Sequence, residues 1–275
     1  MKIFILYTRS FIYIFALLCY SQLVSASIDT AGVQVNYLNN KPPKKLLFVG
    51  NSFSFYNNGI HNHLGSLIRA NNEWERGVNR HKLLTYSGGH MYEQILSIAG
   101  IFKIDKRGFD AVILQGHSNE AILSSKKDRF EAGLKRAVDI IKQQNLEPIL
   151  FMTWGYANDK EMANKVTEAY IQQGKKLGVR VAPVGIAFQK ASVSLPNINL
   201  YVPDVLASKN GNITYRKDLK HPSVAGTYLA ACVFYAMLFD KSPEGNLFTS
   251  SLSETQANAL QKLSWQVVKE FKQPM

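Results

Sequence analysis

The chain has little cysteine. It has two cysteines among 275 residues, and Cys19 lies in an N-terminal segment that we predict to be removed. Cys232 is then the single cysteine of the mature protein, which excludes an intrachain disulfide, so the fold must depend on its core. Cys232 lies in the apolar run of residues 229–234, which predicts buried packing rather than a reactive thiol.

Acidic residues are also scarce. Asp and Glu number 20 against 32 Lys and Arg, which gives a formal net charge of +12. Such a balance would suit acidic polysaccharides or anionic surfaces, but the basic residues are scattered and are not interleaved with aromatic residues. Their dispersal favours a solvated surface. The absence of a nucleic-acid-binding motif argues against a nucleic-acid partner.

The N-terminal residues 1–26 have the pattern of a signal peptide. Lys2 and Arg9 are the only charges before Asp29, an apolar stretch follows them, and small residues end at Ala26. The uninterrupted apolar part is short for a membrane span. We therefore predict cleavage after Ala26, no stable membrane span afterwards, and a secreted or periplasmic protein.

The remaining chain predicts a short arm and one domain. Residues 27–44 are polar and end in two prolines, which predicts an extended arm. Residues 45–275 then form a single α/β domain. Predicted strands cover 45–50, 82–86, 110–115, 148–153 and 179–184. Predicted helices cover 59–71, 91–99, 126–144, 159–177, 223–239 and 254–271. Residues 190–217 have the composition of a loop.

Strands that alternate with helices indicate a flavodoxin-like, doubly wound, five-stranded parallel sheet. Ligands bind such sheets at the carboxyl ends of the strands. Ser52 follows the first predicted strand, Gly88 and Gly89 follow the second, and Gln115 ends the third. A nucleophile, backbone N–H groups and a carboxamide would converge there, and acyl transfer requires these groups. The alternatives are that Ser52 only caps a helix, or that Ser87 is the nucleophile.

A base for the serine is available near the C-terminus. Asp218 precedes His221 by three residues, so its carboxylate could hold His221 Nδ1–H and leave Nε2 to take a proton from Ser52. The alternative is a surface pair or a helix cap.

These blocks, in this order, resemble the SGNH (GDSL-like) hydrolase superfamily over about residues 45–240. The resemblance implies a serine esterase with Ser52 as nucleophile, His221 as base and Asp218 as its orienter. It also implies an oxyanion hole from Ser52, Gly88 and a carboxamide. The chain departs from the family at Asn51, where Asp is commoner before the serine.

The third block of the resemblance, residues 115–119 after the third predicted strand, also departs from the family's usual Gly-x-Asn-Asp. Its Gln-Gly turn is similar to that of carbohydrate O-acetylesterases in the same superfamily, which makes Gln115 the expected donor. A strict alignment would instead place Ser118 at the donor position, with Asn119 beside it, and Asn119 is then the alternative carboxamide donor to Gln115. Asn51, Gly89, Asn119 and Trp154 are candidates for binding substrate.

The sequence predicts neither a metal nor an organic cofactor. His61 and His63 lack cysteine and carboxylate partners at metal-binding spacing. We thus expect an exported serine esterase that acts on O-acyl, above all O-acetyl, groups of a small-molecule or glycan ester. The alternatives are a non-catalytic glycan-binding protein on the same scaffold, a lipid or thioester hydrolase, and an acyltransferase.

Overall fold

The computed structural model describes residues 29–30, 33, 41–207 and 210–272. The predicted signal peptide, 1–26, and most of the predicted arm, 27–44, lie outside the described residues. Within the described part of the chain, no helix is both long enough and apolar enough to cross a membrane.

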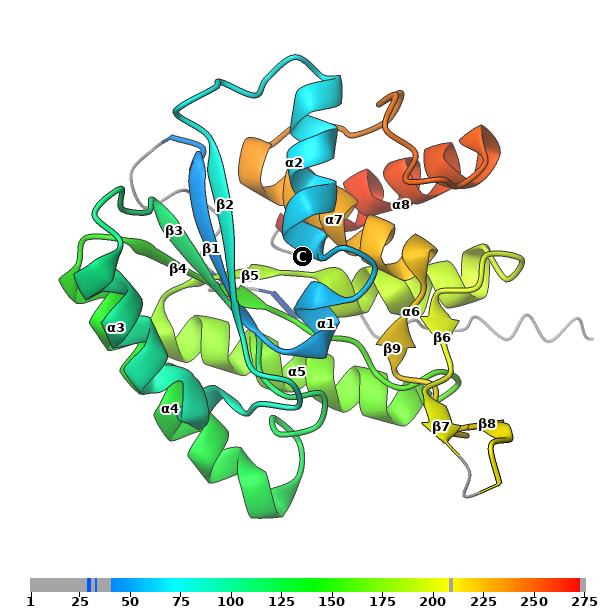
Figure 1. Ribbon diagram of the computed structural model, residues 1–275, viewed down its shortest axis with the longest axis horizontal. Helices are drawn as coiled ribbons and strands as arrows, with labels where there is room; N and C mark the ends of the chain where they lie inside the picture. The colour runs from blue at the N-terminus through cyan, green and yellow to red at the C-terminus, as the bar shows by residue number, and fades with distance from the viewer. Residues whose placement is uncertain (1–28, 31–32, 34–40, 208–209, 273–275) are drawn as a thin grey trace, which may run out of the picture.

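A five-stranded parallel sheet forms the centre of the fold, with the strand order β2-β1-β3-β4-β5 (Figure 1). The strands are β1 (Lys45–Gly50), β2 (Arg80–Thr85), β3 (Ala111–Leu114), β4 (Glu147–Phe151) and β5 (Arg180–Ala182). The apolar residues of β1 are fully buried because helices cover both faces of the sheet. The flavodoxin-like sheet predicted from the sequence is confirmed.

Two groups of helices cover the sheet (Figure 1). On one face lie α2 (Ile60–Ala70), α7 (Val224–Phe239) and α8 (Glu254–Lys272). On the other lie α3 (Ile95–Ile104), α4 (Ser124–Gln143) and α5 (Lys160–Leu177), with a 3₁₀ turn, η1 (Met91–Gln94), before α3. Apolar residues occupy all sides of α7, and it packs between α2 and α8, so Cys232 is buried as predicted. Burial raises the pKa of the Cys232 thiol.

Two helices were not predicted. The short α1 (Ser52–Phe55) follows β1 at once, and α6 (Val184–Ser194) begins directly after Pro183. Residues 179–184 were predicted as one strand, but β5 ends at Ala182 because the Pro183 N-cap starts α6.

The segment 190–217, predicted as a loop, carries small strands. β6 (Tyr201–Val202) pairs antiparallel with β9 (His221–Pro222), and β7 (Val205–Ala207) pairs antiparallel with β8 (Ile213–Tyr215). The β7–β8 hairpin protrudes from the body of the molecule beside β9 (Figure 1).

Candidate active site

Ser52 is the first residue of α1 and lies at the carboxyl edge of the sheet. The side chain of Asn51 caps this helix, since Asn51 Oδ1 accepts a hydrogen bond from Phe53 N at 3.2 Å. The turn needs a glycine at position 50, because a Cβ there would lie 2.2 Å from Gln115 Oε1. The strand-to-helix turn therefore fixes Ser52 between the ends of β1 and β3.

His221 joins Ser52 to a carboxylate. Ser52 Oγ lies 2.7 Å from His221 Nε2, and His221 Nδ1 is hydrogen-bonded to Asp204 Oδ1. With a proton on Nδ1 held by the carboxylate, Nε2 carries the lone pair that accepts the Ser52 hydroxyl proton. The three side chains thus form a proton-transfer chain that can activate Ser52.

The predicted orienter, Asp218, is not the partner of His221. Asp218 Oδ2 lies 3.3 Å from Lys220 Nζ, in an ion pair whose Asp218 side chain is 40% exposed. The prediction for Asp218 is therefore wrong in its geometry, and Asp204 takes the place. The reason is the pairing of β6 with β9. It sets Val202 opposite His221, and Asp204 follows β6 by two residues.

Two aromatic rings fix the plane of the His221 imidazole. Tyr56 stacks on it with 4.2 Å between ring centroids and 4° between planes, and Phe53 contacts it edge-on at 5.8 Å. Desolvation, together with the Asp204 charge and a hydrogen bond to it, raises the pKa of Tyr56. The Tyr56 ring therefore stays neutral and can hold the imidazole without a competing charge.

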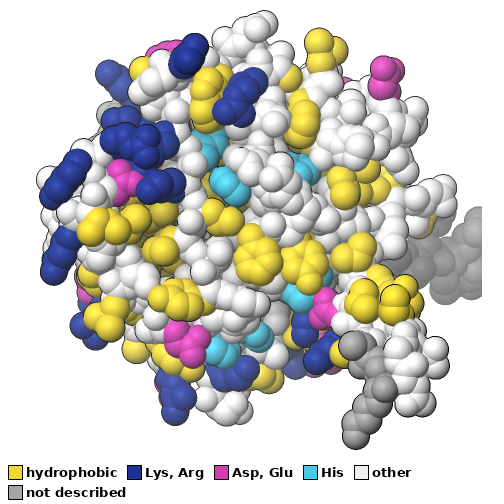
Figure 2. Space-filling view, in the orientation of Figure 1, with side chains coloured by type: hydrophobic (Ala, Val, Ile, Leu, Met, Phe, Trp, Pro, Cys, Tyr) yellow, Lys and Arg dark blue, Asp and Glu magenta, His cyan; other side chains and the backbone are white. Residues whose placement is uncertain are grey.

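A cavity of about 690 Å³ opens onto Ser52 and His221. Its wall also includes Gly88, Ser118 and Arg216. In Figure 2, hydrophobic side chains gather over β7 and β8, next to acidic, basic and histidine side chains. The exposed hydrophobic residues of this hairpin are Val205, Leu206, Ile213 and Tyr215. The nucleophile is thus open to a small or hydroxyl-rich ligand and is flanked by an apolar hairpin.

Gly88 lies in the cavity wall in a left-handed conformation, with φ of 66°. The backbone N–H groups of Ser52 and Gly88 have no acceptor among the described residues. Both amides are consequently available to an oxygen that becomes negative during attack by Ser52.

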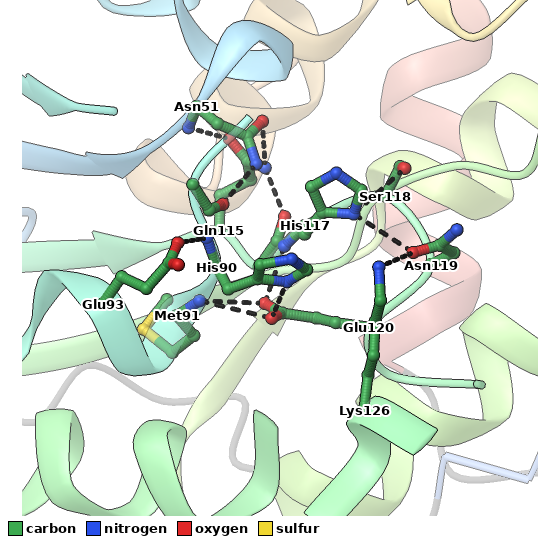
Figure 3. A network of polar contacts seen from close by, with 12 residues as sticks. Asn51, His90, Met91, Glu93, Gln115, His117, Ser118, Asn119, Glu120 and Lys126 are labelled. Atoms are coloured by element: carbon green, nitrogen blue, oxygen red, sulfur yellow. Dashed lines mark hydrogen bonds and ion pairs between the residues drawn. The ribbon is translucent and has the colours of Figure 1, made fainter. Parts of the chain in front are cut away.

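Gln115, the expected carboxamide donor, does not reach the cavity. Its side chain is fully buried, and Nε2 donates to Asn51 Oδ1 at 2.8 Å and to the carbonyl of Gly116 (Figure 3). Its Oε1 accepts from Asn51 N at 2.9 Å and from Ser54 Oγ at 2.8 Å. The prediction for Gln115 is wrong in its geometry, because the amide is buried and three of its four hydrogen bonds go to Asn51 and Ser54, on either side of Ser52.

After β3, Ser118 lines the cavity together with His117. Its Oγ lies 3.1 Å from the hydroxyl of Tyr156. If Tyr156 donates to Ser118, the Ser118 hydroxyl proton is free to point at a ligand. The strict alignment, which placed Ser118 at the donor position, agrees with this geometry better than the Gln115 alternative.

The other candidate substrate-binding residues lie outside the cavity, apart from Asn51, which is in its wall but buried. Asn119 Oδ1 contacts His117 Nδ1 at 3.1 Å and Lys126 Nζ at 3.4 Å. Gly89 accepts a hydrogen bond from Asn51 Nδ2 at 3.0 Å. Trp154 is 1% exposed and stacks between Phe53 and Phe188. Neither Asn119, Gly89 nor Trp154 is in a position to touch a ligand at Ser52.

Asp204 is the residue that sequence reasoning missed. A signal was available, because Asp204 and Asp218 are the only acidic residues between positions 190 and 239. Either one could have been the partner of His221. The spacing of three residues favoured Asp218. The pairing of two short strands, β6 and β9, instead brings Asp204 to His221.

No group of three or more metal-ligating side chains is found among the described residues. The arrangement of Ser52, His221, Asp204 and the two backbone N–H groups is one that can carry out nucleophilic catalysis.

Comparison with known proteins gives the fold. No family model matches the chain, and no curated protein matches it. A DUF4886 family protein from Bacteroides uniformis is 17% identical with a TM-score of 0.60, over 82% of this chain and 94% of that one. A protein assigned to the SGNH hydrolases, from Slackia heliotrinireducens, is 19% identical with a TM-score of 0.53, over 70% and 97%. An acetyl xylan esterase named AlAXEase is 12% identical with a TM-score of 0.51, over 70% and 98%.

Proposed function

We propose that this chain, which has the fold of the SGNH hydrolases, is an exported serine esterase that removes O-acyl groups, chiefly acetyl, from carbohydrate. One observation carries the proposal: the hydrogen-bonded chain from Ser52 through His221 to Asp204, at the wall of an open cavity. A serine that only capped α1 would not need a histidine and a carboxylate in line with it. Asn51 already caps that helix.

The reaction follows from these contacts. Ser52 Oγ attacks the ester carbonyl while His221 Nε2 takes its proton, and Asp204 stabilises the imidazolium. The carbonyl oxygen becomes an oxyanion, to which the N–H groups of Ser52 and Gly88 and the Ser118 hydroxyl donate. The intermediate collapses when His221 gives the proton to the leaving sugar oxygen, and the acyl group stays on Ser52.

Water completes the cycle. His221 takes a proton from a water molecule, which attacks the acyl-Ser52 carbonyl, and the second tetrahedral intermediate releases the carboxylate and the Ser52 hydroxyl. A carbohydrate hydroxyl in place of the water would make the same site an acyltransferase.

Carbohydrate is the proposed substrate because the cavity wall is rich in polar groups. Besides the catalytic residues it contains Asn51, Ser87, His117, Ser118, Arg216 and Lys220. A sugar presents hydroxyls that such groups can bind, whereas a long acyl chain would need a deep apolar pocket. The name of the acetyl xylan esterase with a similar fold points to the same substrate class.

A panel of acetylated sugars, 4-nitrophenyl acetate and longer 4-nitrophenyl esters tests the proposal. Acetate release by the wild type and none above background by Ser52→Ala is the expected result. Ser194→Ala is the matched control, since Ser194 is exposed on α6 and lies outside the cavity. Equal rates for wild type and Ser52→Ala would refute the esterase and favour a glycan-binding protein. Transfer of acetyl to an added acceptor sugar would identify an acyltransferase.

A further inference from the structure

The turn after β3 carries a histidine, His117, whose backbone is held by a buried carboxyl group. His117 lies in the wall of the cavity, and its backbone N–H donates to Glu120 Oε1 at 2.6 Å. Glu120 is fully buried and also accepts from Met91 N at 3.1 Å and lies 2.8 Å from His90 Nδ1 (Figure 3). Burial raises the pKa of Glu120, against the lowering effect of these hydrogen bonds. The buried carboxyl thus ties His117 to η1 and fixes its place in the wall.

The hydrogen bonds around His117 decide its tautomer. Lys126 Nζ lies 3.4 Å from Asn119 Oδ1, and an ammonium group can only donate, so Asn119 presents its oxygen on this side. His117 Nδ1 lies 3.1 Å from the same oxygen and must therefore carry the proton. The contact of Ser118 Oγ with Nδ1 is longer, at 3.5 Å, and does not alter this assignment. Nε2 is left with its lone pair.

His117 stays neutral near pH 7. Desolvation, followed by the charges of His90, Lys126 and Lys220, lowers its pKa to about 4, although the hydrogen bond to Asn119 opposes the shift. The His90 ring packs against it, with 4.5 Å between centroids. No donor to His117 Nε2 is present in the described part of the chain. The cavity that contains Ser52 therefore also contains an imidazole acceptor without a protein partner.

We propose that His117 is a specificity residue whose Nε2 accepts a hydrogen bond from a free hydroxyl of the alcohol part of the substrate. The enzyme would then prefer an ester of a polyol, with a free hydroxyl near the acylated one, over an ester of a simple alcohol. This inference rests on the proposed esterase function. It gives His117 a role separate from the oxyanion hole, because an acceptor nitrogen cannot donate to an oxyanion.

Matched esters measure this role. The probes are a mono-O-acetylated methyl pyranoside with a free neighbouring hydroxyl, its analogue with hydrogen in place of that hydroxyl, and 4-nitrophenyl acetate. The wild type is expected to prefer the hydroxyl-bearing ester by about tenfold in kcat/KM, the value of roughly one good hydrogen bond. His117→Leu should abolish this preference and leave 4-nitrophenyl acetate turnover within about twofold. His117→Gln, which retains an acceptor oxygen, should recover part of it.

The control variant is His61→Leu, the same change on α2 outside the cavity, and it should keep the preference. Thermal unfolding of each variant separates a lost contact from a lost fold. Suppose that turnover depends on Ser52 and that His117→Leu is folded. An unchanged preference in this variant would then overturn the inference about His117 and leave the proposed esterase function standing. If no ester were turned over in a Ser52-dependent way, the proposed function and the inference would both fall.

Discussion

Asp204 Oδ1 is hydrogen-bonded to His221 Nδ1, although 17 positions separate the two residues and a nearer carboxylate, Asp218, lies three positions from the histidine. The β6–β9 pair brings Asp204 to the imidazole, whereas Asp218 is paired with Lys220. The carboxylate that contacts His221 thus lies directly before the protruding β7–β8 hairpin.

Exchange of each carboxylate for an amide separates the two candidates. Asp204→Asn should lower kcat/KM for an acetyl ester on the order of 10³- to 10⁴-fold, because an amide at this position favours the wrong tautomer of His221. Asp218→Asn removes only a half-exposed ion pair and should change kcat/KM by about twofold or less. Initial rates of both variants check this. A larger loss in Asp218→Asn would contradict the assignment of Asp204.

Ser118→Ala removes the hydroxyl that faces the cavity. If that hydroxyl donates to the oxyanion, kcat should fall on the order of 10²-fold with little change in KM, because the interaction forms only in the transition state. The measurement is steady-state kinetics on 4-nitrophenyl acetate. Ser87→Ala, in the same cavity wall, is the matched control and should retain kcat. A fall in both variants alike would argue against a specific role for Ser118.

Gln115→Ala should reduce stability. The variant leaves Asn51 N and the Ser54 hydroxyl without their acceptor inside the protein, so the free energy of unfolding should fall by at least about 2 kcal/mol. Urea unfolding measures the loss. Asn119→Ala, which removes a surface-side amide from the same turn, should cost less than about 1 kcal/mol. A stable Gln115→Ala protein would show that the buried network does not hold the Ser52 turn.

Acid should destabilise the fold between pH 6.5 and 4 through its buried histidines. Desolvation lowers the pKa of His81 to about 4, while its hydrogen bond to the His61 carbonyl opposes the shift. In this window the unfolded chain binds a proton that the folded protein does not. The His81 contribution, roughly 3 kcal/mol, is therefore present above pH 6.5 and is lost as the pH falls towards 4.

His81→Asn tests that contribution, because asparagine does not titrate and can still donate to the His61 carbonyl. Urea unfolding from pH 7.5 to 4.5 should show a shallower fall in stability for the variant than for the wild type. Identical slopes would mean that His81 has the same pKa in the folded and the unfolded protein, which would contradict the lowered pKa. Asp105, whose pKa is lowered to about 2 chiefly by the hydrogen bond from Lys82, adds to the fall mainly below about pH 4.5, where the unfolded chain binds a proton at this carboxyl and the folded protein does not.

The sequence was sufficient for the sheet and for the proximity of Ser52 and His221. Short segments rich in apolar residues, between breakers and alternating with helical patterns, predicted the strands, and Ser52 and His221 meet as the resemblance implied. These features depend on local patterns and on the regular geometry of a parallel sheet.

The features that the sequence did not predict depend on which distant segments lie side by side in the folded protein. The strands β6 and β9 have two residues each and no periodicity to detect, so the choice between Asp204 and Asp218 was beyond local reasoning. Gln115 was misassigned for a related reason. A carboxamide such as that of Gln115 can serve as an oxyanion donor. Gln115 is instead buried against Asn51, because β1 and β3 lie side by side.

Covalent labelling of Ser52 tests the central claim most directly. A fluorophosphonate reacts with a serine only when a base activates it, so the wild type should gain one phosphonyl group per chain, located by mass spectrometry on the peptide that contains Ser52. His221→Ala should label far more slowly, and the control variant Ser194→Ala as fast as the wild type. No label on Ser52, or equal labelling of the wild type and His221→Ala, would contradict the account.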